Sequence, residues 1–159
     1  MEQRAARSIV IRNDVSELAR VGAWVKDWAR SHELPATTAE RIDMCSVEAV
    51  TNIVTHGYVD DAVHQIRLSL ERDAHVVSLE IEDDGMPFDP RVIARPERPS
   101  GLADAKIGGL GVHIVRSLSD DVLHQRCGEL NRLRLVFRLR NSQAAVTTRT
   151  KLEKQNANE

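Results

Sequence analysis

Apolar and polar residues alternate along this chain with two different periods, and each period predicts one kind of element. Apolar residues three or four positions apart share one face of a helix. This spacing covers residues 15–28, 37–56 and 108–119. Alternation, which predicts strands, covers residues 64–70 and 76–81. A run of β-branched residues predicts a strand over 7–12, and residues 121–126 and 130–139 predict a closing hairpin with Gly128 in its turn. The order of these elements predicts an α/β fold, an α+β two-layer sandwich with helices on one face of a mixed, mainly antiparallel sheet.

Local signals refine the ends of the helices. Asn13 or Asp14 can cap the first helix, because a short polar side chain accepts hydrogen bonds from the free N–H groups of a first turn. Thr37 and Glu40 have the spacing of a capping box at the start of the second helix, and Gly57 is placed to end that helix. The apolar face predicted for the first helix consists of Val15, Leu18, Val21, Gly22, Val25 and Trp28.

The remaining segments predict a loop and a tail. Residues 83–106 are rich in proline and glycine, and a loop of this length in a compact domain is usually functional or disordered. Residues 141–159 are polar and show no period. The chain is therefore expected to form one domain over residues 1–140, followed by a polar C-terminal tail.

The composition argues against several classes of function. The chain has 159 residues and carries 22 Lys and Arg against 24 Asp and Glu, a net charge of −2, which argues against a basic face for nucleic acid. Aromatic residues make up 3%, too few for stacking on single strands. Arginine interrupts the apolar runs, the N-terminus does not resemble a signal peptide, and Cys45 and Cys127 are typical of reduced thiols. We expect a cytoplasmic protein that contacts neither nucleic acid nor a membrane directly.

Three short motifs carry candidate chemistry. In the first, Glu48, Asn52 and His56 are four residues apart, so their side chains project from one stripe of the predicted helix. A carboxylate and an amide one turn apart suit Mg²⁺, which prefers oxygen ligands and keeps much of its hydration. A solvated polar helix face would show the same spacing.

The second and third motifs are turns. Asp83 and Gly85 follow a strand, where a carboxylate can accept a hydrogen bond from an exocyclic amine such as that of adenine, and glycine permits close backbone approach. An ordinary acidic turn has the same residues. Residues 108–111, Gly-Gly-Leu-Gly, open the third helix, where backbone N–H groups and the helix dipole favour an anion, although a glycine hinge would look alike. The segment is neither a Walker A loop nor a dinucleotide fingerprint.

Taken in order, the three motifs resemble the N, G1 and G2 boxes of the Bergerat-fold ATP-binding superfamily of gyrase, heat-shock chaperone, mismatch-repair and histidine-kinase ATPases. The sequence is most similar to its small stand-alone branch, the anti-sigma-factor serine kinases. The patterns Glu-Ala-x-x-Asn-x-x-x-His-x-Tyr, Asp-x-Gly-x-x-Phe-Asp-Pro and Gly-Gly-Leu-Gly are met at residues 48–58, 83–90 and 108–111. The resemblance covers about residues 5–140. Pro87 departs from it, since many members have glycine there and proline removes a backbone donor.

The resemblance implies roles for four residues of the first two motifs. Asn52 would be the metal ligand, holding Mg²⁺ that bridges the phosphates of ATP. Glu48 would be the catalytic residue, which orients the nucleophile or acts as general base for a seryl hydroxyl. Asp83 would recognise the adenine amino group, and Gly85 would leave room for the base.

The resemblance also implies how the phosphates are held. The phosphate-binding turn would consist of Gly108, Gly109, Leu110 and Gly111, with backbone N–H groups of Gly109 and Gly111 directed at phosphate. Residues 93–106 would form a lid that excludes competing water. The lid cations available to compensate phosphate charge are Arg95, Arg98 and Lys106.

The function implied by the resemblance is that of an ATP-dependent serine/threonine protein kinase and anti-sigma factor. Such a protein phosphorylates a serine on an anti-sigma-factor antagonist and sequesters a sigma factor. Related proteins dimerise through the N-terminal strand, so residues 9–11 are expected to form a homodimer contact.

Three alternatives stay open at this stage. One is a non-catalytic module in which bound nucleotide sets the conformation and partner switching performs the regulation, and the presence of Glu48 favours catalysis over it. Another is the detached catalytic domain of a histidine kinase, although no helix with a phospho-accepting histidine is evident. The last is an unrelated enzyme built on Glu48, His56 and Asp83, with no nucleophile evident beside them.

Overall fold

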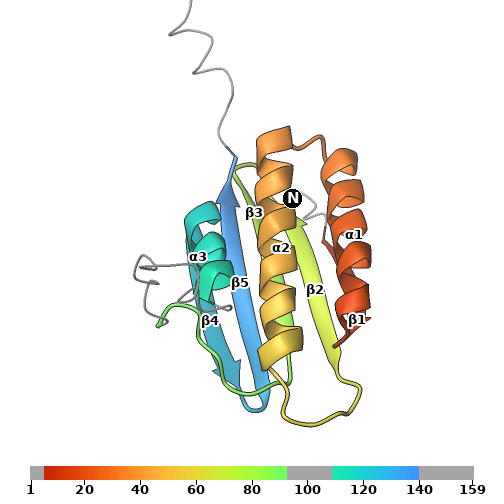
Figure 1. Ribbon diagram of the computed structural model, residues 1–159. Helices are drawn as coiled ribbons and strands as arrows, with labels where there is room; N and C mark the ends of the chain where they lie inside the picture. Colours follow the sequence, from red (N-terminus) through yellow and green to blue (C-terminus); the bar gives the residue numbers. More distant parts are fainter. Residues whose placement is uncertain (1–5, 93–108, 140–159) are drawn as a thin grey trace, which may run out of the picture.

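The computed structural model describes residues 6–92 and 109–139. Its elements are β1 (Arg7–Arg12), a 3₁₀ turn (Val15–Glu17), α1 (Leu18–Ser31), α2 (Ala36–His56), β2 (Gln65–Arg72), β3 (Val76–Asp83), α3 (Gly109–Leu118), β4 (Asp121–Cys127) and β5 (Leu130–Arg138). Figure 1 shows two layers: the helices cover one face of the sheet, with α2 between α1 and α3. The predicted two-layer fold is therefore confirmed.

The described strands form one sheet in the order β1-β2-β3-β5-β4. Each neighbouring pair is antiparallel, so the described part of the sheet is purely antiparallel and not mixed. The β4–β5 hairpin turns at Gly128, whose φ of +60° lies in the left-handed region that favours glycine. Strands β1 and β4 are the edges, which places residues 9–11 on an edge strand as expected.

The core lies between the sheet and the helices. Successive side chains of a strand face opposite sides of the sheet, so alternate residues of the central strands point at the helices. The fully buried side chains include Trp28, Ile42, Val50, Ile66, Leu68, Leu70, Val77, Leu79, Ile81, Leu135 and Phe137. In this layer α2 packs against α1 on one side and against α3 on the other.

The first helix begins later than its hydrophobic pattern suggests. Asp14 caps the 3₁₀ turn before α1, because its Oδ1 accepts a hydrogen bond from the Ser16 N–H at 2.8 Å. Val15 belongs to this turn and is 60% exposed, so its predicted place on the buried face is wrong. The tighter 3₁₀ geometry breaks the helical period of the apolar positions.

The start of α2 also differs from the prediction. Pro35 occupies the cap position, and no side chain caps the helix. Thr37 is already the second helical residue, so Thr37 and Glu40 do not form the predicted capping box. The Pro35 carbonyl accepts hydrogen bonds from the N–H groups of Thr38 at 2.9 Å and Ala39 at 3.0 Å. Proline is suited to this end of a helix because its missing N–H would have no partner there.

The second helix ends at Gly57, as predicted, but the glycine is required by space and not by a left-handed turn. Its φ of −78° is open to any residue. A Cβ at Gly57 would lie 2.5 Å from the Ile53 carbonyl oxygen. The carbonyl of Gly57 accepts a hydrogen bond from the Met86 N–H at 2.7 Å. The end of α2 is thereby joined to the segment that follows β3.

Candidate functional site

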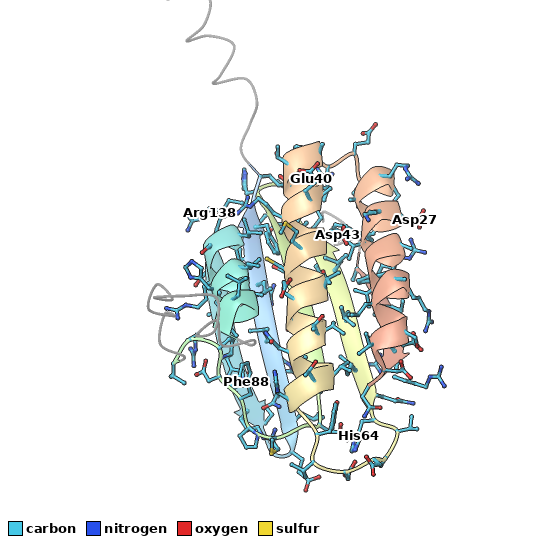
Figure 2. The ribbon with its side chains drawn as sticks, viewed as in Figure 1. Asp27, Glu40, Asp43, His64, Phe88 and Arg138 are labelled. Atoms are coloured by element: carbon cyan, nitrogen blue, oxygen red, sulfur yellow. The ribbon has the colours of Figure 1, made fainter. Side chains whose placement is uncertain are left out.

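An open pocket of about 680 Å³, counting the part open to solvent, lies where α2, α3 and the ends of β3, β4 and β5 meet. Residues 86–90 contribute one wall, and Figure 2 shows Phe88 of this wall at the same end of the molecule as His64. The residues lining the other walls include Ala49, Asn52, Ile53, His56, Asp83, Val112, Val115, His124, Asn131 and Leu133. A mostly apolar cleft with a few convergent polar groups is typical of a small-molecule site.

The carboxylate of Asp83, the last residue of β3, is 6% exposed and lines this pocket. Its Oδ1 accepts hydrogen bonds from the Gly85 N–H at 2.9 Å and from Asn131 Nδ2 at 3.0 Å. Within the described residues no donor reaches Oδ2, so this oxygen is available to a donor on a ligand. Burial raises the pKa of Asp83 above its ordinary value of 3.8, and the two hydrogen bonds oppose that rise.

The turn after β3 is packed so closely that Gly85 is required for steric reasons. A Cβ there would lie 2.6 Å from the Gly57 carbonyl oxygen and 2.8 Å from Asp83 Oδ1. The close approach is between two stretches of backbone, the end of α2 and the turn that orients Asp83. The predicted role of Gly85, to leave room for a base, stays a prediction.

The start of α3 lies directly against the polar stripe of α2. A Cβ on Gly111 would be 2.6 Å from Glu48 Oε2 and 3.3 Å from Asn52 Nδ2, so a larger residue would displace one of these side chains. The first N–H groups of a helix have no partner within the helix and carry partial positive charge. The carboxylate, the amide and the helix N-terminus, which are distant in sequence, are therefore neighbours in the structure.

Of the other predicted site residues, the structure describes Gly109 and Leu110. Gly109 is the first residue of α3, and Leu110 is 63% exposed, so a contribution of Leu110 to the site would come from its backbone. Lys106 and Gly108 lie outside the described residues, as does the predicted lid. The roles expected for these residues stay predictions.

Sequence reasoning missed Asn131, a buried amide at the base of the pocket. Only 4% of the residue is exposed, and its Nδ2 donates to Asp83 Oδ1 at 3.0 Å and to the Met86 carbonyl at 2.9 Å. The signal that could have identified it is its position in the strand pattern. Asn131 has the same parity as Leu133 and Leu135, which face the helices, and an amide at an inward position needs polar partners.

His124 of β4 was missed as well. It lines the pocket, and its Nε2 is buried without a partner among the described residues. Its Nδ1 lies 3.8 Å from Asp89 Oδ2. Asp89 is held chiefly by Arg91, whose Nη2 donates to Oδ2 at 2.6 Å, and this bond lowers the pKa of Asp89 to about 2. The wall of the pocket is thus fixed by a charged pair beside a histidine.

A family model described as the histidine kinase-like ATPase domain matches residues 11–137. The chain belongs to the histidine kinase-like ATPase family. The match includes every residue that lines the pocket, from Ala49 to Leu133, so the resemblance noted in the motifs is confirmed. Among the described residues of the chain, no helix is both long and apolar enough to cross a membrane.

Two curated relatives of this chain are a serine/threonine-protein kinase and an anti-sigma F factor. The serine/threonine-protein kinase BtrW of Bordetella bronchiseptica is 30% identical over 112 residues, which cover 70% of this chain and 79% of BtrW. The anti-sigma F factor of Bacillus subtilis is 30% identical over 98 residues, which cover 61% of this chain and 67% of that factor.

A solved structure shares the fold. The RsbU and RsbW domains of a Mycobacterium tuberculosis protein align with a TM-score of 0.58 and 18% identity. The alignment covers 84% of this chain and 32% of the other chain, so this chain spans about a third of that protein's length.

His64 links the loop after α2 to the turn that follows Asp83. Its Nε2 lies 2.8 Å from Asp60 Oδ1 and its Nδ1 lies 3.1 Å from Asp84 Oδ2. The ring stacks on Tyr58 with centroids 4.2 Å apart. The bonds to Asp60 and Asp84 raise the pKa of His64 above its ordinary value of 6.5.

We expect the stability of the protein to fall near neutral pH through the loss of the His64 proton. Protonated histidine donates from both ring nitrogens, whereas the neutral ring donates from one. Because folding raises the pKa of His64, its contribution is fully present below pH 6.5 and is lost as pH rises through the folded-state pKa. Urea unfolding midpoints of wild type should fall between about pH 6 and about pH 9 more steeply than those of His64→Gln.

The matched control is His75→Gln, which changes an exposed histidine in the β2–β3 turn. This variant should keep the wild-type dependence on pH. Superimposable profiles for His64→Gln and wild type would show that the His64 proton contributes nothing to folding.

Proposed function

We propose that this chain is an ATP-dependent serine/threonine protein kinase that acts as an anti-sigma factor. It transfers a phosphoryl group to a serine of an anti-sigma-factor antagonist, and it sequesters a sigma factor. The observation that carries the proposal is the packing of Gly111 against Glu48 and Asn52 beside a pocket that also holds Asp83. The names of the relatives, a serine/threonine-protein kinase and an anti-sigma F factor, support the same function.

In this proposal the pocket binds ATP between α2 and α3. The unpaired Oδ2 of Asp83 accepts a hydrogen bond from the adenine amino group. The apolar walls cover the faces of the base. The backbone N–H groups of Gly109 and Gly111, at the positive end of α3, bind the phosphates.

The donors beside the start of α3 fit Mg²⁺. Glu48 and Asn52 supply oxygen atoms, which this ion prefers, and Asn52 is the proposed ligand. No three His, Cys, Asp or Glu side chains gather as a metal cluster in residues 6–92 and 109–139, so most ligands would be phosphate oxygens and water. When bound, the ion supplies positive charge that offsets the charge of the phosphates.

Glu48 takes the proton in the transfer step. The serine Oγ of the antagonist forms a bond to the γ-phosphorus of ATP while the bond from that phosphorus to the β,γ-bridging oxygen breaks. ADP leaves with the bonding electron pair, and the seryl proton passes to the Glu48 carboxylate. Glu48 precedes Asn52 by one turn of α2, so both side chains face the same end of the nucleotide.

Further parts of the proposal concern the setting of the protein. The chain acts in the cytoplasm, where its partners, a sigma factor and an antagonist, are found. A second copy pairs along β1, whose edge position leaves one row of backbone groups open to another strand.

The proposed function is tested by following labelled γ-phosphate from Mg·ATP to a serine-bearing antagonist domain encoded in the same genome. We expect stoichiometric label on one serine, and no label when that serine is replaced by alanine. Binding of ATP without transfer would support the non-catalytic, nucleotide-gated module instead. Absence of both binding and transfer would contradict the proposal altogether.

A further inference from the structure

We infer that Arg126 is a positioning residue that makes the pocket select adenine over guanine, because it fixes the orientation of the Asn131 amide against Asp83. The inference rests on the proposed binding of a nucleotide in this pocket. It assigns a specificity role to a residue of β4 that belongs to none of the three motifs.

Asp83, Asn131 and Arg126 form one row across three adjacent strands. Asp83 of β3 pairs in register with Asn131 of β5, and Asn131 pairs in turn with Arg126 of β4. Residues paired in this way share one face of the sheet. Arg126 Nη1 donates to Asn131 Oδ1 at 2.9 Å and to the Gly85 carbonyl at 2.8 Å, and Asn131 Nδ2 donates to Asp83 Oδ1 at 3.0 Å. The row is therefore a continuous chain of hydrogen bonds that ends at the carboxylate.

The arginine fixes the direction of this chain. A guanidinium has donors and no acceptor, so the side of Asn131 that faces Arg126 must be the oxygen. The amide nitrogen is then directed at Asp83 Oδ1 and the Met86 carbonyl, both of which are acceptors. Without Arg126, the Asn131 oxygen loses its donor, and the amide is held in this orientation by its bonds to acceptors alone.

This direction determines what Asp83 offers to a base. With Oδ1 occupied by Asn131 and Gly85, the ionised carboxylate presents Oδ2 purely as an acceptor. Adenine carries an amino donor at C6, whereas guanine carries a carbonyl oxygen there, and two acceptors facing each other in a buried site are unfavourable. A protonated Asp83 could instead donate to that oxygen, and the discrimination would weaken.

The charges around Asp83 explain why its ionised form needs this support. Burial and the neighbouring Asp84 both raise the pKa of Asp83, whereas the Asn131 bond and the charge of Arg126 lower it. Among the described residues, other titratable groups near Asp83 are Tyr58 after α2 and the pocket histidines His56 and His124. Arg126 is the cation that acts on Asp83 both directly and through the amide.

The test measures dissociation constants for Mg·ATP and Mg·GTP by isothermal titration at several pH values. Wild type should prefer ATP. In Arg126→Gln we expect ATP to bind about tenfold more weakly, because the charge-assisted hydrogen bond from Arg126 to Asn131 is lost. The affinity for GTP should change little. The decline of ATP affinity on acidification should also begin at higher pH than in wild type, and Arg126→Lys should restore part of the preference.

The matched control is Arg132→Gln. Arg132 is the neighbour of Asn131 on β5, but it faces the other side of the sheet and pairs with Glu82 at 2.7 Å. This variant should keep the wild-type ratio of ATP to GTP affinity. Asn131→Asp is a second test if Arg126→Gln does not fold. It replaces the Nδ2 donor to Asp83 by an acceptor, so it should also lower the ratio of ATP to GTP affinity.

The outcomes separate this inference from the proposed function. An unchanged ratio of ATP to GTP affinity in Arg126→Gln, whether both affinities stay the same or both fall equally, would overturn the positioning role. The proposed binding of a nucleotide would stand. Failure of wild type to bind either nucleotide would overturn the proposed function and this inference with it.

Discussion

Replacing Glu48 by glutamine is expected to lower the rate of phosphoryl transfer to the antagonist by about 10²–10⁴-fold, the usual contribution of a general base. Glutamine keeps the shape of the side chain beside Gly111 but cannot take up the seryl proton. Binding of ATP should change little, because the contacts proposed for the adenine ring lie at the other end of the pocket. Single-turnover transfer of labelled phosphate, together with the dissociation constant for ATP, measures both effects.

Glu40→Gln is the control for this prediction. Glu40 is an exposed glutamate near the start of the same helix (Figure 2), two turns before Glu48. Its replacement removes the same charge from α2 and should leave transfer unchanged. Transfer by Glu48→Gln at the wild-type rate would refute the role of Glu48 as a base.

Asp83→Asn is expected to weaken ATP binding by about tenfold to a hundredfold, the size of a lost hydrogen bond to a charged group. The amide has one oxygen, and its NH₂ group would face either Asn131 Nδ2 or the adenine amine, which are both donors. ADP should lose the same factor, because the two nucleotides share the base. Isothermal titration of both nucleotides therefore separates recognition of the base from recognition of the phosphates.

The next residue supplies the control. Asp84 has a side chain that is 45% exposed and bonded to His64, so Asp84→Asn removes the same charge without touching the pocket. We expect a much smaller change in affinity for this variant. A loss confined to ATP in Asp83→Asn, with ADP binding unaffected, would contradict the assignment of Asp83 to the base.

The fold could be predicted from the sequence wherever one period extends over several residues. The inward alternation of Ile66, Leu68 and Leu70 in β2 is an example, because each residue is buried exactly as its parity requires. Prediction failed at the starts of α1 and α2. Val15 and the Thr37–Glu40 pair follow the right spacing, but a 3₁₀ turn and a proline cap displace the helices from it.

The candidate site was predictable to the extent that its residues are linked by local spacing. Glu48 and Asn52 share a helical stripe, and Gly109 and Gly111 lie in the first turn of a helix, as expected. The contact of Gly111 with both side chains depends on how α3 packs on α2, and the motifs suggested it only through the family they resemble.

The row of Asp83, Asn131 and Arg126 could not be read from the sequence in the same way. Its members come from β3, β5 and β4, and their alignment depends on the register of two strand pairings. A shift of either pairing by one residue would turn the partner to the other face of the sheet. Long-range register is set by the packed core, so a polar network of this kind becomes visible only in three dimensions.

The most direct test of the account is a crystal structure of the chain with Mg²⁺ and a non-hydrolysable analogue of ATP. We expect the adenine amino group within hydrogen-bond distance of Asp83 Oδ2, and the phosphates between Asn52 and the backbone of Gly109–Gly111. A nucleotide bound elsewhere, or a base that does not contact Asp83, would contradict the central claim that α2 and α3 together enclose the ATP site.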